Sequence, residues 1–172
     1  MISSFYGIIK YHFKGVFIMS VKKMNYLFKG IILLLGISGF SLLLVLGPKI
    51  ELFLNDGQNN NIIQLLLWIT AIPVLFILIS LWRISSDLLR ETIFSKKNSQ
   101  RLIQVAYSGV IESVIYGAAL MIGLLKYQGN YPYFFICFIF FFLGLIIAVI
   151  ASLLSYIFKL AGQLKNENDL TI

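Results

Sequence analysis

The chain has 172 residues, of which 59% are hydrophobic and 12% are charged, and its formal net charge is +7. A soluble globular domain carries roughly 25% charged residues, so this composition excludes an ordinary water-soluble fold and predicts a protein embedded in a lipid bilayer. The basic residues lie in short segments beside apolar runs rather than in one extended patch, which argues against direct nucleic-acid binding.

The N-terminal arm, residues 1–23, has two interpretations. Apolar residues recur at helical spacing, with Lys10 and Lys14 on the opposite face, which predicts an amphipathic helix lying at the membrane surface. The alternative is an overlong reading frame, since Met19 and Met24 are both reasonable starts in place of Met1. The sequence leaves both open.

Four apolar stretches are each long enough to cross a bilayer, which takes about 20 helical residues. They are residues 27–46, 62–82, 102–125 and 133–158. The sequence therefore predicts an all-α fold, in which residues 24–172 form one membrane domain built as a four-helix bundle.

The basic residues around these spans predict the orientation. Eleven lie in the arm, in the loop 83–101 and in the tail 159–172, and Lys29 lies near the start of the first span, whereas only Lys49 and Lys126 lie in the other two connections. Because cytoplasmic segments carry the excess of Lys and Arg, we expect both termini, this loop and the tail on the cytoplasmic side.

Small residues predict where helices touch. They recur every fourth position in the third span, at Gly109, Ser113 and Gly117, and in the fourth, at Gly144, Ala148 and Ser152. Such stripes let helix backbones approach closely in lipid. We expect the last two spans to pack as an antiparallel hairpin, although the same stripes also fit a homo-oligomer.

The stretch SGVIESVIYG places Glu112 near the middle of the third span. A charged residue there costs roughly 2.5–3.5 kcal/mol, and the middle of the spans holds no Lys, Arg or His to pair with it. We therefore expect a protonated acid with neutral partners, from Ser108, Tyr116, Ser38, Ser41 or Thr70. Three roles remain open for Glu112. It forms a hydrogen bond between helices, it is a proton or cation site, or it is a local feature that the membrane tolerates.

The sequence contains no recognisable combination of catalytic residues. Cys137 is the only cysteine and His12 the only histidine, and the chain lacks the common metalloprotease, hydrolase and phosphate-binding motifs. Asp87 and Glu91 lie beside Arg83 and Arg90, which predicts charge pairs on a helix surface. The sequence thus predicts a protein that is not an enzyme and has no metal or cofactor.

Two stretches carry a family resemblance: IFSKKNSQRL, which enters the third span, and AGQLKNENDLTI, which ends the chain. Their placement resembles the YoaS-like family of small four-span bacterial membrane proteins, whose domain of unknown function is DUF2975. The residues that match the family motif are Phe94, Ser95, Asn98, Arg101, Leu102, Glu167, Asp169 and Leu170.

The resemblance implies a multi-pass protein of the bacterial cell membrane, without an established activity. It also implies association with a cytoplasmic helix-turn-helix regulator that is often encoded nearby. From the residues alone, Ser95 or Asn98 caps the third span while Lys96, Lys97 and Arg101 meet anionic headgroups.

Two functions from different classes follow. The first is a sensing or regulatory component that docks a cytoplasmic protein through the loop 83–101 and the tail 159–172. The alternative is a small transporter or channel subunit, or an immunity-type membrane protein, that uses Glu112 as a proton or cation site.

Overall fold

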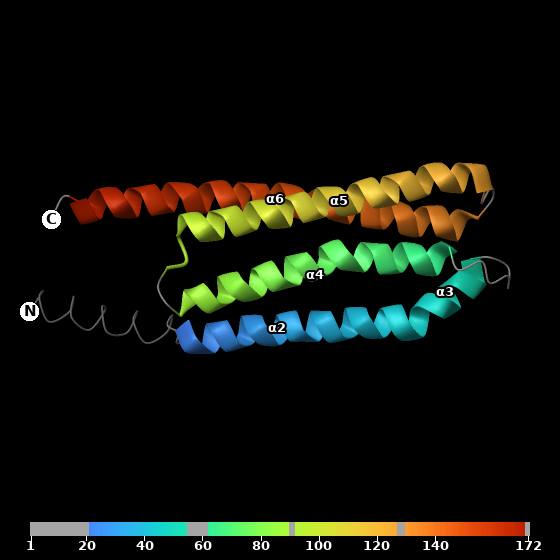
Figure 1. Cartoon of the computed structure of the whole chain (residues 1–172), viewed down its shortest axis with the longest axis horizontal. Coiled ribbons are helices and arrows are strands. Elements are labelled where there is room, and N and C mark those ends of the chain that lie inside the picture. Colours follow the sequence, from blue (N-terminus) through green and yellow to red (C-terminus); the bar gives the residue numbers. More distant parts are fainter. Residues whose placement is uncertain (1–20, 55–61, 90–91, 127–129, 171–172) are drawn as a thin grey trace, which may run out of the picture.

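The computed structural model of the chain describes residues 21–54, 62–89, 92–126 and 130–170, and these contain helices without any strand. In chain order the helices are α2 (Val21–Ser41), a π-helical turn (Leu42–Leu46), α3 (Gly47–Leu54), α4 (Ile62–Leu88), α5 (Lys96–Lys126) and α6 (Tyr131–Leu170) (Figure 1). The predicted all-α fold is confirmed.

The described residues hold four helices that are long and apolar enough to cross a membrane. They cover Val21–Val45, Ile63–Leu88, Lys96–Leu125 and Tyr131–Lys165. This confirms the four predicted spans. Each forms a helix because a backbone in lipid must satisfy its polar groups within its own segment.

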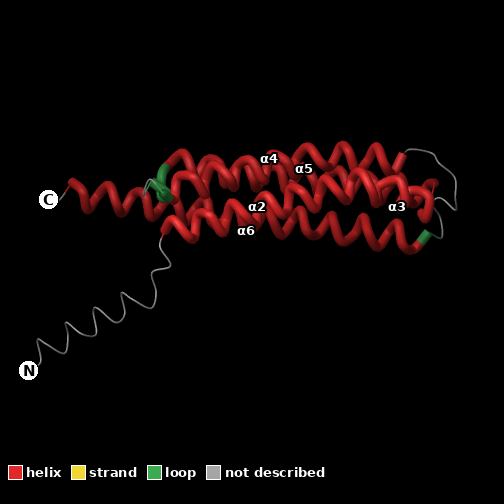
Figure 2. The backbone as a smooth tube through the Cα atoms, turned by 90° about the horizontal axis from the view of Figure 1, so that it is seen from below, coloured by secondary structure: helices red, strands yellow, loops and turns green. Residues whose placement is uncertain are grey.

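The helices extend beyond the apolar stretches that define the spans. The helix α4 continues to Leu88 and α5 begins at Lys96, so the described non-helical part of the loop is reduced to Leu89 and residues 92–95. The tail likewise continues α6 as far as Leu170, where Figure 2 shows this helix projecting past its neighbours. Residues 159–170 contain no proline, and they include three leucines and two lysines, which favour helices.

At the other end of the first span the chain forms a second helix. The π-helical turn ends at Leu46, and α3 begins directly at Gly47. The Gly47 N–H bonds back to the Leu42 carbonyl oxygen, and the next residue, Pro48, has no N–H group to donate to the preceding turn. Of the predicted N-terminal arm, residues 1–20 lie outside the described part, and Val21–Lys23 belong to α2.

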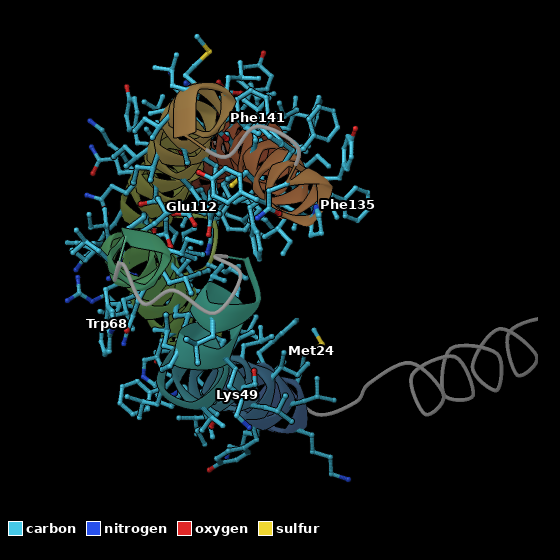
Figure 3. All side chains as sticks on the ribbon, turned by 90° about the vertical axis from the view of Figure 1, so that its right-hand side faces the viewer. Met24, Lys49, Trp68, Glu112, Phe135 and Phe141 are labelled. Atoms are coloured by element: carbon cyan, nitrogen blue, oxygen red, sulfur yellow. The ribbon has the colours of Figure 1, made fainter. Side chains whose placement is uncertain are left out.

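The spans lie side by side in the order α2, α4, α5, α6. The closest pair is α5 with α6, and α4 packs between α5 and α2, whereas α2 makes no extensive contact with α6. Seen along the helices, they form an arc that is open between α2 and α6 (Figure 3).

The start of α2, the loop between α4 and α5, and the end of α6 share one end of the array (Figure 1). We call this the basic end. Its described cationic residues include Lys22, Lys23, Arg83, Lys96, Lys97, Arg101, Lys159 and Lys165.

Glycine makes the contact between α5 and α6 as close as it is. A Cβ atom on Gly144 would lie 2.7 Å from the carbonyl oxygen of Gly109, and one on Gly109 would lie 2.7 Å from the carbonyl oxygen of Gly144. The Ser113 hydroxyl lies 3.0 Å from the Phe141 carbonyl oxygen and donates to it across the interface. Buried Ala148 packs in the same contact.

One of the expected contact residues lies differently. Gly117 packs against the Phe141 ring of α6, but Ser152 is exposed. Toward the basic end the contact is made instead by buried Ala151 and by Ser155, whose hydroxyl donates to the Ser99 carbonyl oxygen at 2.8 Å. A spacing of four residues drifts about 40° per step around a helix with 3.6 residues per turn, so the contact face moves off Ser152.

We predict that Gly144→Ala destabilises the protein although alanine is the better helix former. The added methyl group meets backbone atoms that cannot move aside, and such overpacking costs about 1–3 kcal/mol. Thermal unfolding in detergent should show a lower midpoint. The matched control is Gly39→Ala, because a Cβ atom on Gly39 meets nothing within 4 Å. An equal or higher midpoint for Gly144→Ala would contradict the close contact.

Candidate functional site

The first turn of α5 is capped by Ser95. The backbone N–H of Asn98 lies 3.3 Å from the Ser95 hydroxyl and 3.0 Å from its carbonyl oxygen, and the N–H of Ser99 donates to the same carbonyl oxygen at 3.1 Å. An N-cap side chain satisfies N–H groups that have no partner within the helix. Of the two predicted caps, Ser95 therefore has this role, and Asn98 is free for another.

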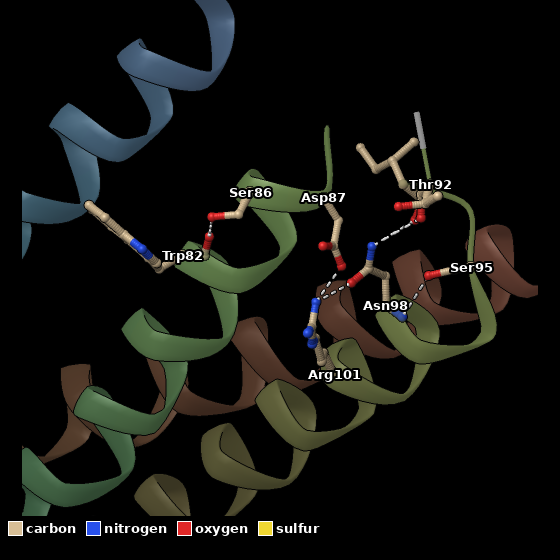
Figure 4. A network of polar contacts seen from close by, with 8 residues as sticks. Trp82, Ser86, Asp87, Thr92, Ser95, Asn98 and Arg101 are labelled. Atoms are coloured by element: carbon tan, nitrogen blue, oxygen red, sulfur yellow. Dashed lines mark hydrogen bonds and ion pairs between the residues drawn. The ribbon is translucent and has the colours of Figure 1, made fainter. Parts of the chain in front are cut away.

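The Asn98 side chain is completely buried and holds the loop against the helix. Its Nδ2 group donates to the carbonyl oxygens of Ile93, at 3.1 Å, and Thr92, at 3.4 Å (Figure 4). Its Oδ1 atom accepts a hydrogen bond of 2.7 Å from Nη1 of Arg101. One amide group thus satisfies two loop carbonyls and orients an arginine.

Arg101 carries the connection on to α4. Its Nη1 atom also lies 2.6 Å from Oδ2 of Asp87, and both side chains are mostly buried, with 14% and 16% of their surface exposed. The sequence predicted that Asp87 pairs with basic residues of its own helix, so this bridge to α5 was not predicted. The connection between the second and third spans is short and polar. This feature of the sequence could have indicated that residues on its two sides lie close together.

The loop also packs on α6. The Phe94 ring meets the Phe158 ring edge to face, with 5.3 Å between centroids. A Cβ atom on Gly162 would lie 2.7 Å from the Phe94 carbonyl oxygen, so only glycine allows the loop this close to α6. The loop is therefore held on one side by Asn98 and on the other by α6.

The structure brings only part of the family motif together at the loop between α4 and α5. Phe94, Ser95, Asn98 and Arg101 meet around the loop, and Leu102 is buried directly below them. The other three motif residues lie in the last turns of α6. Of these Glu167 is exposed, while the side chains of Asp169 and Leu170 lie outside the described part.

Glu112 lies in the middle of α5, within the arc of helices in Figure 3. Only 8% of its surface is exposed, and its buried Oε2 atom has no hydrogen-bond partner among the described residues. Tyr116 lies one turn away on the same face of α5, with its hydroxyl 3.4 Å from that of Thr70 on α4.

Two other expected partners of Glu112 bond elsewhere. The hydroxyls of Ser38 and Ser108 donate to carbonyl oxygens of their own helices. Among the described residues, no three His, Cys, Asp or Glu side chains gather into a metal-binding group.

These features define a multi-pass membrane protein with four apolar helices and a polar network at one end. Residues 60–172 match the family model described as a protein of unknown function, DUF2975, and the chain belongs to that family. The matched region contains α4, α5 and α6 together with every residue of the network. No enzyme family is indicated.

The chain is similar to the uncharacterized membrane protein YoaS of Bacillus subtilis (strain 168). The two are 29% identical over 148 residues, which cover 82% of this chain and 92% of the relative. No solved structure matches the chain. The predicted resemblance is confirmed.

Proposed function

We propose that this protein is a regulatory membrane component that docks an acidic segment of a cytoplasmic protein between the start of α5 and the end of α6. The observation that carries the proposal is a groove of about 800 Å³ at this place, which we call the loop–tail groove. Its lining includes Phe94, Phe158 and Gly162, and three lysines, Lys96, Lys159 and Lys165.

The lysines give the groove its charge preference. Lys96 and Lys159 are exposed and form no ion pair with another described residue. The apolar part comes from the two phenylalanine rings that hold the loop on α6. A groove that combines aromatic surface with unpaired cations complements a segment carrying both apolar and acidic side chains.

The polar network supports this role because it gives the groove a fixed wall. Asn98 binds the carbonyls of Thr92 and Ile93, so the backbone beside Phe94 is held in one conformation. A preorganised surface loses less conformational freedom when a partner binds. The helix-turn-helix regulator that the family resemblance implies fits the groove if it presents acidic side chains there.

The proposal is tested by placing a photo-crosslinking amino acid at Gln163, which lines the groove, in the full-length protein in cells. We expect it to trap one defined cytoplasmic protein. Lys96→Glu combined with Lys159→Glu should reduce this product about tenfold, since each exposed ion pair contributes up to about 1 kcal/mol.

The matched control is Lys22→Glu combined with Lys23→Glu, which makes the same charge change at the same end of the molecule, away from the groove. The control should trap the partner as the unmodified protein does. Equal loss in both variants, or no trapped protein in the unmodified chain, would contradict docking at the groove.

A second candidate function rests on the unpaired Oε2 atom of Glu112. A buried carboxyl group without a partner, one helical turn from Tyr116, whose hydroxyl lies 3.4 Å from that of Thr70, is the arrangement expected of a proton or cation site in a transport path. The arc of helices is also open on the side between α2 and α6.

This candidate predicts that the protein in liposomes dissipates an imposed pH gradient, and that Glu112→Gln abolishes the flux without lowering the unfolding midpoint. Glutamine keeps the shape and the hydrogen bonding but does not titrate. A pH-sensitive dye inside the liposomes measures the flux. If Glu112→Gln behaves as the unmodified protein while Glu112→Leu is unstable, Glu112 is a structural hydrogen-bonding group instead.

A further inference from the structure

A second groove at the basic end lies between α4 and α5 and shares only Gln100 with the lining of the loop–tail groove. It has a volume of about 450 Å³ and is lined by Arg83, Lys97, Gln100, Arg101 and Gln104. We call it the α4–α5 groove. Its lining combines three cations with two amides and includes no carboxylate, which is the composition of an anion-binding surface.

Arg101 is held in place for such a role. Its Nη1 atom makes the contacts of the guanidinium with Asp87 and with Asn98 (Figure 4). An arginine has five N–H donors, so three remain on Nε and Nη2, and these bond to no described residue. A guanidinium fixed along one edge can bind an anion with the other at little further entropic cost.

The other two cations supply the net charge. Asp87 offsets the charge of Arg101, but Arg83 and Lys97 are exposed and form no ion pair within the described part of the chain. They reach the groove from different helices, Arg83 from α4 and Lys97 from the first turn of α5. An anion in the groove would therefore meet positive charge from both sides.

The position of the groove indicates the kind of anion. Arg83 directly follows Trp82, the last residue of the apolar stretch 62–82, and Lys29 of α2 lies over the Trp82 ring at 5.0 Å from its centroid. Tryptophan and basic side chains at the end of a span mark the level of the lipid headgroups. The groove is thus at the depth where lipid phosphates lie.

From these observations we propose that the α4–α5 groove binds the phosphate group of an anionic lipid. Arg101 donates from its fixed guanidinium, and Arg83 and Lys97 neutralise the charge. The amides of Gln100 and Gln104 add donors beside the phosphate oxygens. Gln100 lines both grooves, but Arg83, Lys97, Arg101 and Gln104 do not line the loop–tail groove, so the charge of this site is separate from the proposed docking function.

Native mass spectrometry of the full-length protein tests the proposal, with phosphatidylglycerol and phosphatidylcholine of identical acyl chains as probes. The unmodified protein should retain phosphatidylglycerol in preference to phosphatidylcholine. Arg83→Gln combined with Lys97→Gln should weaken the retention of phosphatidylglycerol about tenfold, since each basic side chain near the headgroups contributes strongly to binding anionic lipid. Both residues are exposed, so the fold should persist, which circular dichroism checks.

The control is Lys22→Gln combined with Lys23→Gln, which removes the same charge at the same end and should weaken retention clearly less, because neither lysine lines the groove. Equal weakening in both double variants would show a general attraction to the basic end and would overturn the site. Soluble glycerol phosphate provides the other arm. If it binds as tightly as the lipid and displaces it, the groove takes free phosphate compounds and the assignment to lipid is wrong.

Discussion

The buried amide of Asn98 is the contact on which the basic end of this protein depends. It lies where the end of α4, the loop and the start of α5 meet, and it is completely buried. A buried amide must be hydrogen-bonded, and its partners here are two loop carbonyls and Arg101, which in turn binds Asp87. The loop conformation, the arginine orientation and the position of α4 are therefore coupled.

A different kind of contact holds the helices together within the apolar region. Between α5 and α6 the glycines at 109 and 144 let the backbones touch, and hydroxyls bridge them at both ends, from Ser155 to Ser99 and from Tyr133 to Ala119. The first span is attached more lightly, mainly through α4, where the Ser85 hydroxyl donates to Oδ1 of buried Asn25 at 2.7 Å. The hairpin of α5 and α6 is thus the rigid part that supports both grooves.

The spans and the hairpin were predictable from the sequence, because apolar length and small residues act locally along one helix. The Asp87–Arg101 bridge was not, since it depends on how two helix ends approach across a loop. Ser152 is exposed although it continues the spacing of four residues from Gly144. Residues at this spacing therefore share one helix face only over a short distance. The sequence did not predict that the tail is helical, because its polar residues suggested a segment outside the helices although several of its residues favour helices.

The central claim is that Asn98 fixes the conformation of the loop that packs on α6. Spin labels on Thr92 and Leu164, in a Cys137→Ala background, measure this directly by pulsed electron paramagnetic resonance, because both positions are exposed and Cys137 is the only native cysteine. We expect one narrow distance distribution, and a broad one once Asn98→Asp replaces the donor to the loop carbonyls. A distribution of equal width in both proteins would contradict the claim.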